Sequence, residues 1–328
     1  PDWAIVGERL WGAAPNGERG NPLNPEKAEQ IYASIADYIE FLKTDYGVEV
    51  EYFSFNESDL GINVRQTGAE HAEFIKGLGA HLASRGLRTK LLLGDTADAN
   101  GWWFLKEAME DPETHKYIGA VSFHSWRGWD YETLEKWDDA ARAMNVPLIV
   151  GEGSTDAAAW RFPIIFDQST FAQQEISLYT RILAICEPLT ILQWQLTSDD
   201  SILAGGGLFG NDTEEMRPTQ RFWNLKQLAE TPEDSFALPA ESSSETVLVA
   251  ALGETAKELY TLHVVNNGAE RETTITGFPP DLNQLHLYFT SPDHTMDYLG
   301  TVSVEDGMAR FTLPAIGFAS LYTQPISE

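Results

Sequence analysis

Short apolar runs alternate with longer amphipathic runs along the chain between about residues 24 and 230. The short runs are rich in Val, Ile and Leu and predict buried strands. We expect these strands to begin near residue 3 and to cover residues 48–55, 88–93, 118–123, 147–150 and 190–194. The amphipathic runs predict helices over residues 25–46, 74–86, 103–109, 131–144, 171–185 and 219–229. Strands and helices in such alternation indicate an α/β fold with a parallel sheet.

Two architectures are built from such units, a (β/α)8 TIM barrel and a doubly wound sheet. No GxGxxG or GxxxxGK[ST] phosphate loop follows a predicted strand, which disfavours a doubly wound nucleotide-binding sheet. We therefore predict a TIM barrel. A complete barrel has eight strands in about 250 residues, whereas six predicted strands lie in the first 232 residues here. This count predicts that the first two strand–helix units are missing, or that they come from outside this sequence.

The pattern changes after Pro232 to short runs in which apolar and polar residues alternate, with many Ser and Thr residues. An Asn266-Asn267-Gly268 turn and several prolines separate these runs. Such segments are typical of antiparallel hairpins, and we expect a small β-sandwich. The predicted domains are therefore a barrel over residues 1–232 and a β-sandwich over residues 233–328.

The chain has 50 acidic and 22 basic residues, a formal charge of -28. This charge repels phosphate backbones and anionic lipid surfaces, so nucleic acid is excluded as a partner. The single cysteine, Cys186, cannot form an intramolecular disulfide, and no apolar stretch is long enough to span a membrane. We expect a secreted or periplasmic protein without a cofactor or metal. Its oligomeric state is left open.

Two carboxylates stand where predicted strands end, which is where parallel α/β barrels carry their reactive groups. Strand 48–55 leads into Asn56-Glu57, and strand 147–150 leads into Gly151-Glu152. Hydrolysis of a glycosidic bond needs two carboxyl groups, a protonated one that donates to the leaving oxygen and an ionised one that attacks the sugar or activates water. The pair predicts a glycoside hydrolase, and the distance between the two groups would decide between retention and inversion of configuration.

The segments Phe53-Ser54-Phe55-Asn56-Glu57, Val150-Gly151-Glu152 and Gln193-Trp194 together resemble the retaining glycoside hydrolases of clan A. The resemblance implies that Glu57 is the general acid/base and that Glu152 is the nucleophile. It also implies that Asn56 binds the sugar 2-hydroxyl and that Trp194 forms the floor of that subsite. The C-terminal segment 311–321 is similar to the side domain of families 30 and 39, whose members act on β-linked glycans. One departure is that the clan's arginine on the second strand has no counterpart that we can place.

Further residues in predicted loops are candidates for carbohydrate binding. His124 ends strand 118–123, and the resemblance suggests a bond to the nucleophile or to a sugar hydroxyl; Asp95 follows strand 88–93 and lines a subsite or caps the next helix. Indole rings stack on pyranose faces, so we expect sugar contacts from the loop residues Trp126, Trp129 and Trp160. The tryptophans in predicted helices are expected to pack inside the protein, and these are Trp102, Trp103, Trp137 and Trp223.

Three alternatives are weighed against a glycosidase. A metal-dependent hydrolase would use Asp95, His124 and Glu152 as ligands, although the chain has no HxH or HExxH motif. A carbohydrate-binding protein on a barrel that has lost its activity would keep the binding residues but not the chemistry. A serine hydrolase is disfavoured because a GxSxG motif is missing.

Overall fold

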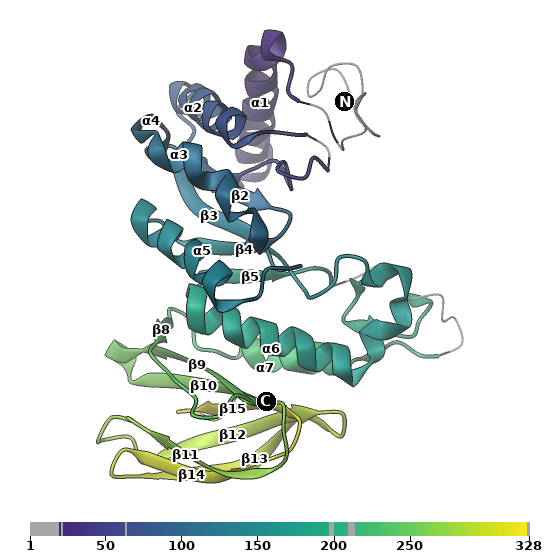
Figure 1. Ribbon diagram of the computed structural model, residues 1–328, viewed down its shortest axis with the longest axis vertical. Coiled ribbons are helices and arrows are strands. Elements are labelled where there is room, and N and C mark those ends of the chain that lie inside the picture. Colours follow the sequence, from purple (N-terminus) through teal and green to yellow (C-terminus); the bar gives the residue numbers. More distant parts are fainter. Residues whose placement is uncertain (1–19, 21, 63, 197–199, 209–213, 327–328) are drawn as a thin grey trace. The chain divides into compact units, whose positions relative to one another are not determined.

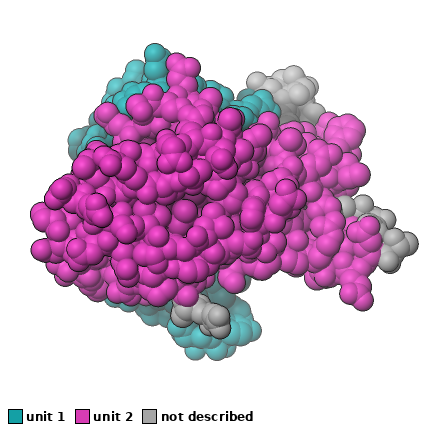
Figure 2. Space-filling view, turned by 90° about the horizontal axis from the view of Figure 1, so that it is seen from below, with its two compact units in different colours: residues 1–153, 188–192 teal, residues 154–187, 193–328 magenta. Residues whose placement is uncertain are grey.

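The computed structural model describes residues 20, 22–62, 64–196, 200–208 and 214–326 (Figure 1). The predicted strand near residue 3 lies outside these residues. The chain divides into two compact units (Figure 2), residues 1–153 with 188–192 and residues 154–187 with 193–328. No helix in the described part is both long and apolar enough to cross a membrane.

The first unit contains a parallel sheet with helical connections. Its strands are β1 (Tyr52–Phe53), β2 (Lys90–Thr96), β3 (Ile118–His124) and β4 (Leu148–Gly153), and β5 (Thr190–Gln193) completes the sheet. Its helices are η1 (Pro25–Lys27), α1 (Ala28–Tyr46), α2 (Gly68–Ser84), η2 (Ala99–Leu105), α3 (Lys106–Glu110), α4 (Pro112–His115) and α5 (Tyr131–Met144). The five strands lie side by side in sequence order. A doubly wound sheet reverses its order at a switch point, so this arrangement is consistent with the wall of a TIM barrel.

Local signals set the helix ends in this unit. Asn24 caps η1 through a bond from the Glu26 amide, and α1 ends at Gly47 with a φ of 70°. Helix α2 begins with a capping box between Thr67 and Glu70. These features follow from sequence alone, because the capping side chains lie within three residues of the groups that they bind.

The prediction for strand 48–55 was wrong in length, because β1 comprises only Tyr52–Phe53. These two residues pair with Lys90 and Leu91 of β2, and β1 is the first strand in the sheet order. Val48 is exposed, although the apolar run in which it lies predicted that it would be buried. The prediction that two early strand–helix units are missing stays a prediction.

The second unit combines helices α6 (Ser169–Cys186) and α7 (Gln220–Ala229) with an antiparallel sheet. The sheet order is β11 (Arg271–Thr276), β14 (Met308–Leu313), β13 (His294–Glu305), β12 (Gln284–Ser291), β15 (Gly317–Tyr322), β10 (Leu259–Asn266), β9 (Val247–Glu254) and β8 (Phe236–Leu238). Shorter elements are η3 (Ala159–Arg161), η4 (Pro163–Asp167), β6 (Leu203–Ala204), β7 (Arg217–Pro218) and η7 (Thr255–Lys257). The antiparallel pairing predicted after residue 232 is confirmed, whereas the sandwich and the domain division at residue 233 stay predictions.

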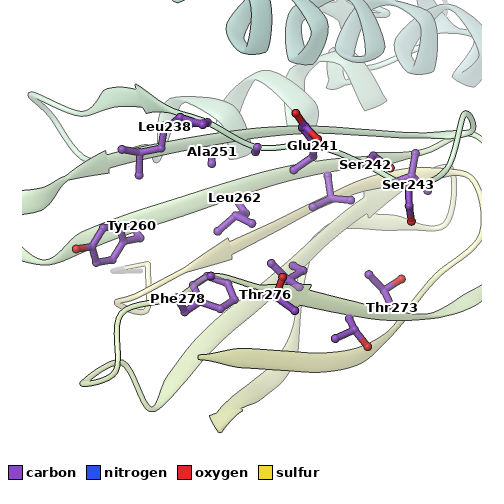
Figure 3. A pocket seen from close by; sticks show the side chains of 18 of the residues that line it. Leu238, Glu241, Ser242, Ser243, Ala251, Tyr260, Leu262, Thr273, Thr276 and Phe278 are labelled. Atoms are coloured by element: carbon purple, nitrogen blue, oxygen red, sulfur yellow. The ribbon is translucent and has the colours of Figure 1, made fainter. Parts of the chain in front are cut away.

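Helices α6 and α7 are joined to this sheet by buried amides. Gln173 of α6 donates to the carbonyl of Asn266, and Gln227 of α7 donates to the carbonyl of Phe318. The two strands that end the sheet order, β8 and β11, both line a cavity of about 710 Å³ (Figure 3). Its walls carry aliphatic and aromatic side chains such as Leu262 and Phe278.

The second unit also contains a buried ion pair. Arg221 of α7 donates to both carboxylate oxygens of Glu175 in α6, at 2.8 and 2.9 Å. Ser154 and Gln193 donate to the same carboxylate. Desolvation by burial would lower the pKa of Arg221, but the charge of Glu175 raises it above its usual value. The pair therefore stays charged inside the unit.

Candidate functional site

Four polar residues lie at the carboxyl ends of neighbouring parallel strands in the first unit. Glu57 follows β1, Asp95 is the second-last residue of β2, His124 ends β3, and Glu152 lies near the end of β4. All four are buried. Because parallel strands present their carboxyl ends at one edge of the sheet, residues that are distant in sequence meet there.

The backbone at two of these positions adopts an unusual conformation. Glu57 and Asp95 have φ angles of 50° and 54°, in the left-handed region that residues other than glycine rarely occupy. The Glu57 amide donates to the Asp95 carbonyl at 3.1 Å, so a backbone hydrogen bond connects the segment after β1 to the end of β2. Strain of this kind is concentrated at functional sites, where it orients side chains that a regular strand would point elsewhere.

His124 lies at the centre of the cluster. Its Nδ1 is 3.1 Å from Oε1 of Glu57 and 3.2 Å from Oε2 of Glu152, and its Nε2 is 3.3 Å from Oδ1 of Asp95. Burial would lower the pKa of His124, but hydrogen bonds to the three carboxylates raise it to about 11. The ring is therefore an imidazolium at neutral pH, and both of its nitrogens donate.

Two serines and one glycine hold Asp95 in place. Ser54 donates to Oδ2 of Asp95 at 2.5 Å, and Ser122 donates to Oδ1 at 3.0 Å. Burial would raise the pKa of Asp95, but its hydrogen bond to His124, the charge of that ring and the two serine bonds lower it. A methyl group on Gly151 would lie only 2.5 Å from Oδ1, so the residue before Glu152 must lack a side chain for the strands to approach. Asp95 is thus an ionised partner of His124.

The two glutamates are close to each other. One carboxylate oxygen of Glu57, one of Glu152 and a ring nitrogen of His124 all lie within 4.8 Å of one another. The carboxyl groups of retaining glycosidases are roughly 5 to 5.5 Å apart, whereas inverting enzymes need about 6.5 Å or more to admit a water. Two carboxyl groups with oxygens this close can act on the same substrate bond.

The other predicted residues of this unit take different positions. Trp126 is buried, and its indole N–H donates to Oε2 of Glu152 at 3.2 Å. Trp129 is half-buried and donates to the carbonyl of Ser125 at 2.6 Å. Asn56 is exposed beside Glu57. Trp126 therefore contacts a catalytic candidate directly, and the predicted sugar contacts of these three residues stay predictions.

Trp160 and Trp194 belong to the second unit. Trp160 is 50% exposed, with the Arg161 guanidinium 5.3 Å from its ring centroid. Trp194 is 38% exposed, and its carbonyl accepts from the side chain of Gln193 at 3.1 Å. Both indoles are accessible, and their predicted roles in sugar binding stay predictions.

The cluster of Glu57, His124 and Glu152 has ligand types that also suit a divalent metal ion. The metal site expected from the sequence consists of Asp95, His124 and Glu152. Asp95 and Glu152 contact opposite ring nitrogens of His124, so the three side chains do not point at one common position. A metal ion at Nδ1 would have to displace the proton that the raised pKa of His124 retains.

Sequence reasoning missed the two serines and the glycine that hold Asp95. Ser54 stands inside the motif before Glu57, and Ser122 alternates with buried apolar residues in β3. A polar residue on the buried side of a strand is the signal that could have identified Ser122. Its partner could not have been named, because Asp95 lies 27 residues away.

No protein-family model matches this sequence, and a search of curated proteins finds no match. Several solved structures share its fold. A family 30 endoxylanase from Clostridium papyrosolvens aligns with a TM-score of 0.76 and 13% identity, over 95% of this chain and 75% of that chain. A family 39 β-xylosidase from Caulobacter crescentus gives a TM-score of 0.61 and 12% identity, over 91% and 73%. A conserved exported protein from Bacteroides fragilis gives 0.68 and 14%, over 92% and 70%.

Proteins with these low identities share the fold, and the predicted resemblance to glycoside hydrolase families 30 and 39 is confirmed at that level.

Proposed function

We propose that this chain is a retaining β-glycoside hydrolase that cleaves a β-linked oligosaccharide or polysaccharide. The proposal is supported chiefly by the separation of Glu57 and Glu152, whose nearest ligand oxygens lie within 4.8 Å of each other at one edge of a parallel sheet. Both carboxyl groups belong to buried residues that keep 8% of their surface exposed. The fold shared with endoxylanases and a β-xylosidase agrees with this chemistry.

The reaction proceeds by two displacements at the anomeric carbon. Glu152 attacks this carbon while Glu57 donates its proton to the leaving oxygen, so the glycosidic bond breaks and a glycosyl ester forms. Glu57 then accepts a proton from water, whose oxygen displaces Glu152 from the sugar. Two inversions restore the original configuration, and both carboxyl groups return to their starting states.

His124 and Trp126 orient the nucleophile in this proposal. Both side chains donate to Oε2 of Glu152, so we assign the attack on the anomeric carbon to Oε1 of Glu152. The imidazolium charge stabilises the ionised carboxylate of Glu152. His124 also donates to Oε1 of Glu57, so the acidic proton of Glu57 is carried on Oε2 and faces the leaving group.

A mechanism-based inhibitor tests these roles. A 2,4-dinitrophenyl 2-deoxy-2-fluoro-β-glycoside forms the glycosyl-enzyme quickly because its leaving group needs no acid, and the fluorine slows hydrolysis of the intermediate. We expect mass spectrometry to find the label on Glu152 in the wild type and in Glu57→Gln, and no label in Glu152→Gln. A label on a different residue, or none with β-xyloside and β-glucoside reagents, would refute the assignment.

Glu57→Ala provides a second test of the acid/base role. Removing this carboxyl group should lower turnover of substrates with poor leaving groups by about two to four orders of magnitude. Substrates with dinitrophenolate leaving groups should still form the intermediate, and added azide should then yield a β-glycosyl azide. An equal loss for both leaving groups would contradict the role of Glu57.

The same variants separate the alternatives. A carbohydrate-binding protein without activity would bind glycans equally well before and after Glu152→Gln and would hydrolyse none. A metal-dependent hydrolase would lose activity with a chelator and regain it with the metal ion. We also propose that the chain acts outside the cytoplasm, since a polysaccharide cannot cross a membrane and one protein of this fold is an exported protein.

A further inference from the structure

Three exposed aromatic side chains lie on two neighbouring elements of the first unit, η2 and α5. Trp102 and Trp103 of η2 are 40% and 54% exposed, and Tyr131 at the start of α5 is 61% exposed. The expectation that Trp102 and Trp103 pack inside the protein was therefore wrong. Trp137, which was expected to pack as well, is fully buried. We call Trp102, Trp103 and Tyr131 the rim patch.

The elements that carry the rim patch are joined by hydrogen bonds. The Ala99 amide, at the start of η2, donates to the carbonyl of Arg127 at 3.1 Å, and Arg127 lies four residues before Tyr131. The buried indole of Trp137 in α5 donates to the carbonyl of Ala99 at 2.7 Å. One backbone bond thus joins η2 to the loop before α5, and one side-chain bond joins η2 to α5 itself.

Gly101, the residue before the rim patch, lies beside the segment that follows the proposed acid/base. Gly101, which precedes Trp102, packs so tightly that a methyl group on it would lie 2.9 Å from Cβ of Thr96 and 3.1 Å from Oδ2 of Asp59. Asp59 follows Glu57 by two residues and accepts a bond from the Ala97 amide at 3.0 Å. The turn after Glu57 therefore packs against the start of η2.

Donors and carboxylates both lie beside the rings, since Glu132 and Glu135 are exposed next to Tyr131 and Lys136. The Lys136 ammonium lies 4.4 Å from the centroid of the Trp102 ring, and the side chains of Arg127 and Asn100 are exposed. Flat aromatic faces stack on the C–H faces of pyranose rings, and donors between them bind hydroxyl oxygens. A polyanion is disfavoured by the charge of -28 on the whole chain.

We propose that the rim patch binds a neutral β-linked glycan chain outside the cleavage site. The substrate class rests on the proposed function, whereas the binding itself requires no catalysis. The patch would hold a polymer while the carboxylate pair acts on it, so it would favour long substrates over short ones.

Affinity electrophoresis tests this proposal in the full chain that carries Glu152→Gln, so that the polymer is not cleaved. The gels contain soluble xylan, soluble mixed-linkage β-glucan or the polyanion polygalacturonate. We expect xylan or β-glucan to retard the protein, and Trp102→Ala with Trp103→Ala to raise the dissociation constant about tenfold, equivalent to about 1.4 kcal/mol. Tyr38→Ala, which removes an exposed aromatic ring from α1 of the same unit, is the matched control and should leave retardation unchanged.

Three results would overturn the proposal: no retardation by either neutral glycan, equal retardation of the double variant and the control, or retardation by polygalacturonate alone. Circular dichroism and thermal unfolding would establish that the double variant is folded. If glycan binding depends on the two tryptophans but the fluoroglycoside labels no residue, the proposed function fails and the rim patch stands. If labelling succeeds and retardation does not depend on them, the rim patch fails alone.

Discussion

His124 should make the stability of this protein depend on pH in the neutral to alkaline range. The side chain is 1% exposed and bonded to three carboxylates, and its pKa is raised from 6.5 to about 11. A raised pKa in the folded state means that the folded protein keeps a proton that the unfolded chain has lost. The stabilising contribution of His124 is therefore complete below pH 6.5 and is lost as the pH rises toward 11.

The magnitude follows from the same linkage. Each pH unit between the two pKa values should lower the free energy of unfolding by a little over 1 kcal/mol, so about 3 kcal/mol is lost between pH 7 and pH 9.5. The lowered pKa of Asp95 acts only in acid, because its contribution is present above pH 3.8 and is lost as the pH falls further. Of these two groups, only His124 therefore changes the free energy of unfolding in the alkaline range.

The assay compares denaturant unfolding of the wild type and His124→Gln at several pH values from 7 to 9.5, followed by tryptophan fluorescence. Glutamine is neutral throughout this range, so it cannot lose a proton. We expect the wild type to be more stable at pH 7 and the difference to shrink steadily as the pH rises. Two curves that fall in parallel would refute the assignment of an imidazolium to His124.

Two further substitutions test the buried charges. Asp95→Asn removes the charge that faces Nε2 of His124, so the pKa of His124 should fall and the alkaline loss of unfolding free energy should end at a lower pH than in the wild type; an unchanged pH dependence in denaturant unfolding would show that Asp95 does not maintain that charge. Glu175→Gln leaves the guanidinium of Arg221 buried without its counterion and should cost about 3 to 5 kcal/mol of unfolding free energy. Denaturant unfolding measures this loss, and adding Arg221→Met should recover part of it; a loss below about 1 kcal/mol would contradict the reasoning.

Most elements could be predicted because their signals are local. Helix α5 covers the predicted range, since Asp130 caps its first turn and Asn145 ends it in the left-handed conformation. Strand 48–55 was too long because apolar residues show that a segment can be buried, not that a neighbouring strand is present along its whole length. The tryptophans of η2 show the same limit, since helical spacing predicted packing that the fold does not provide.

Part of the candidate site was also predictable. Periodicity located the strand ends at Glu57 and Glu152, and the resemblance to clan A suggested that the two act together. What the chain order could not show was the arrangement around His124, whose ring lies between both glutamates while Asp95 contacts its other nitrogen.

Sequence by itself determined the residue types, the capping groups and the alternation of strands and helices, because these depend on neighbours within a few positions. Tertiary structure alone decided which side chains share a proton and which aromatic rings remain open to solvent. The physical reason is that charge state and exposure are set by atoms within a few ångströms, and around His124 those atoms belong to residues up to 67 positions away in the chain.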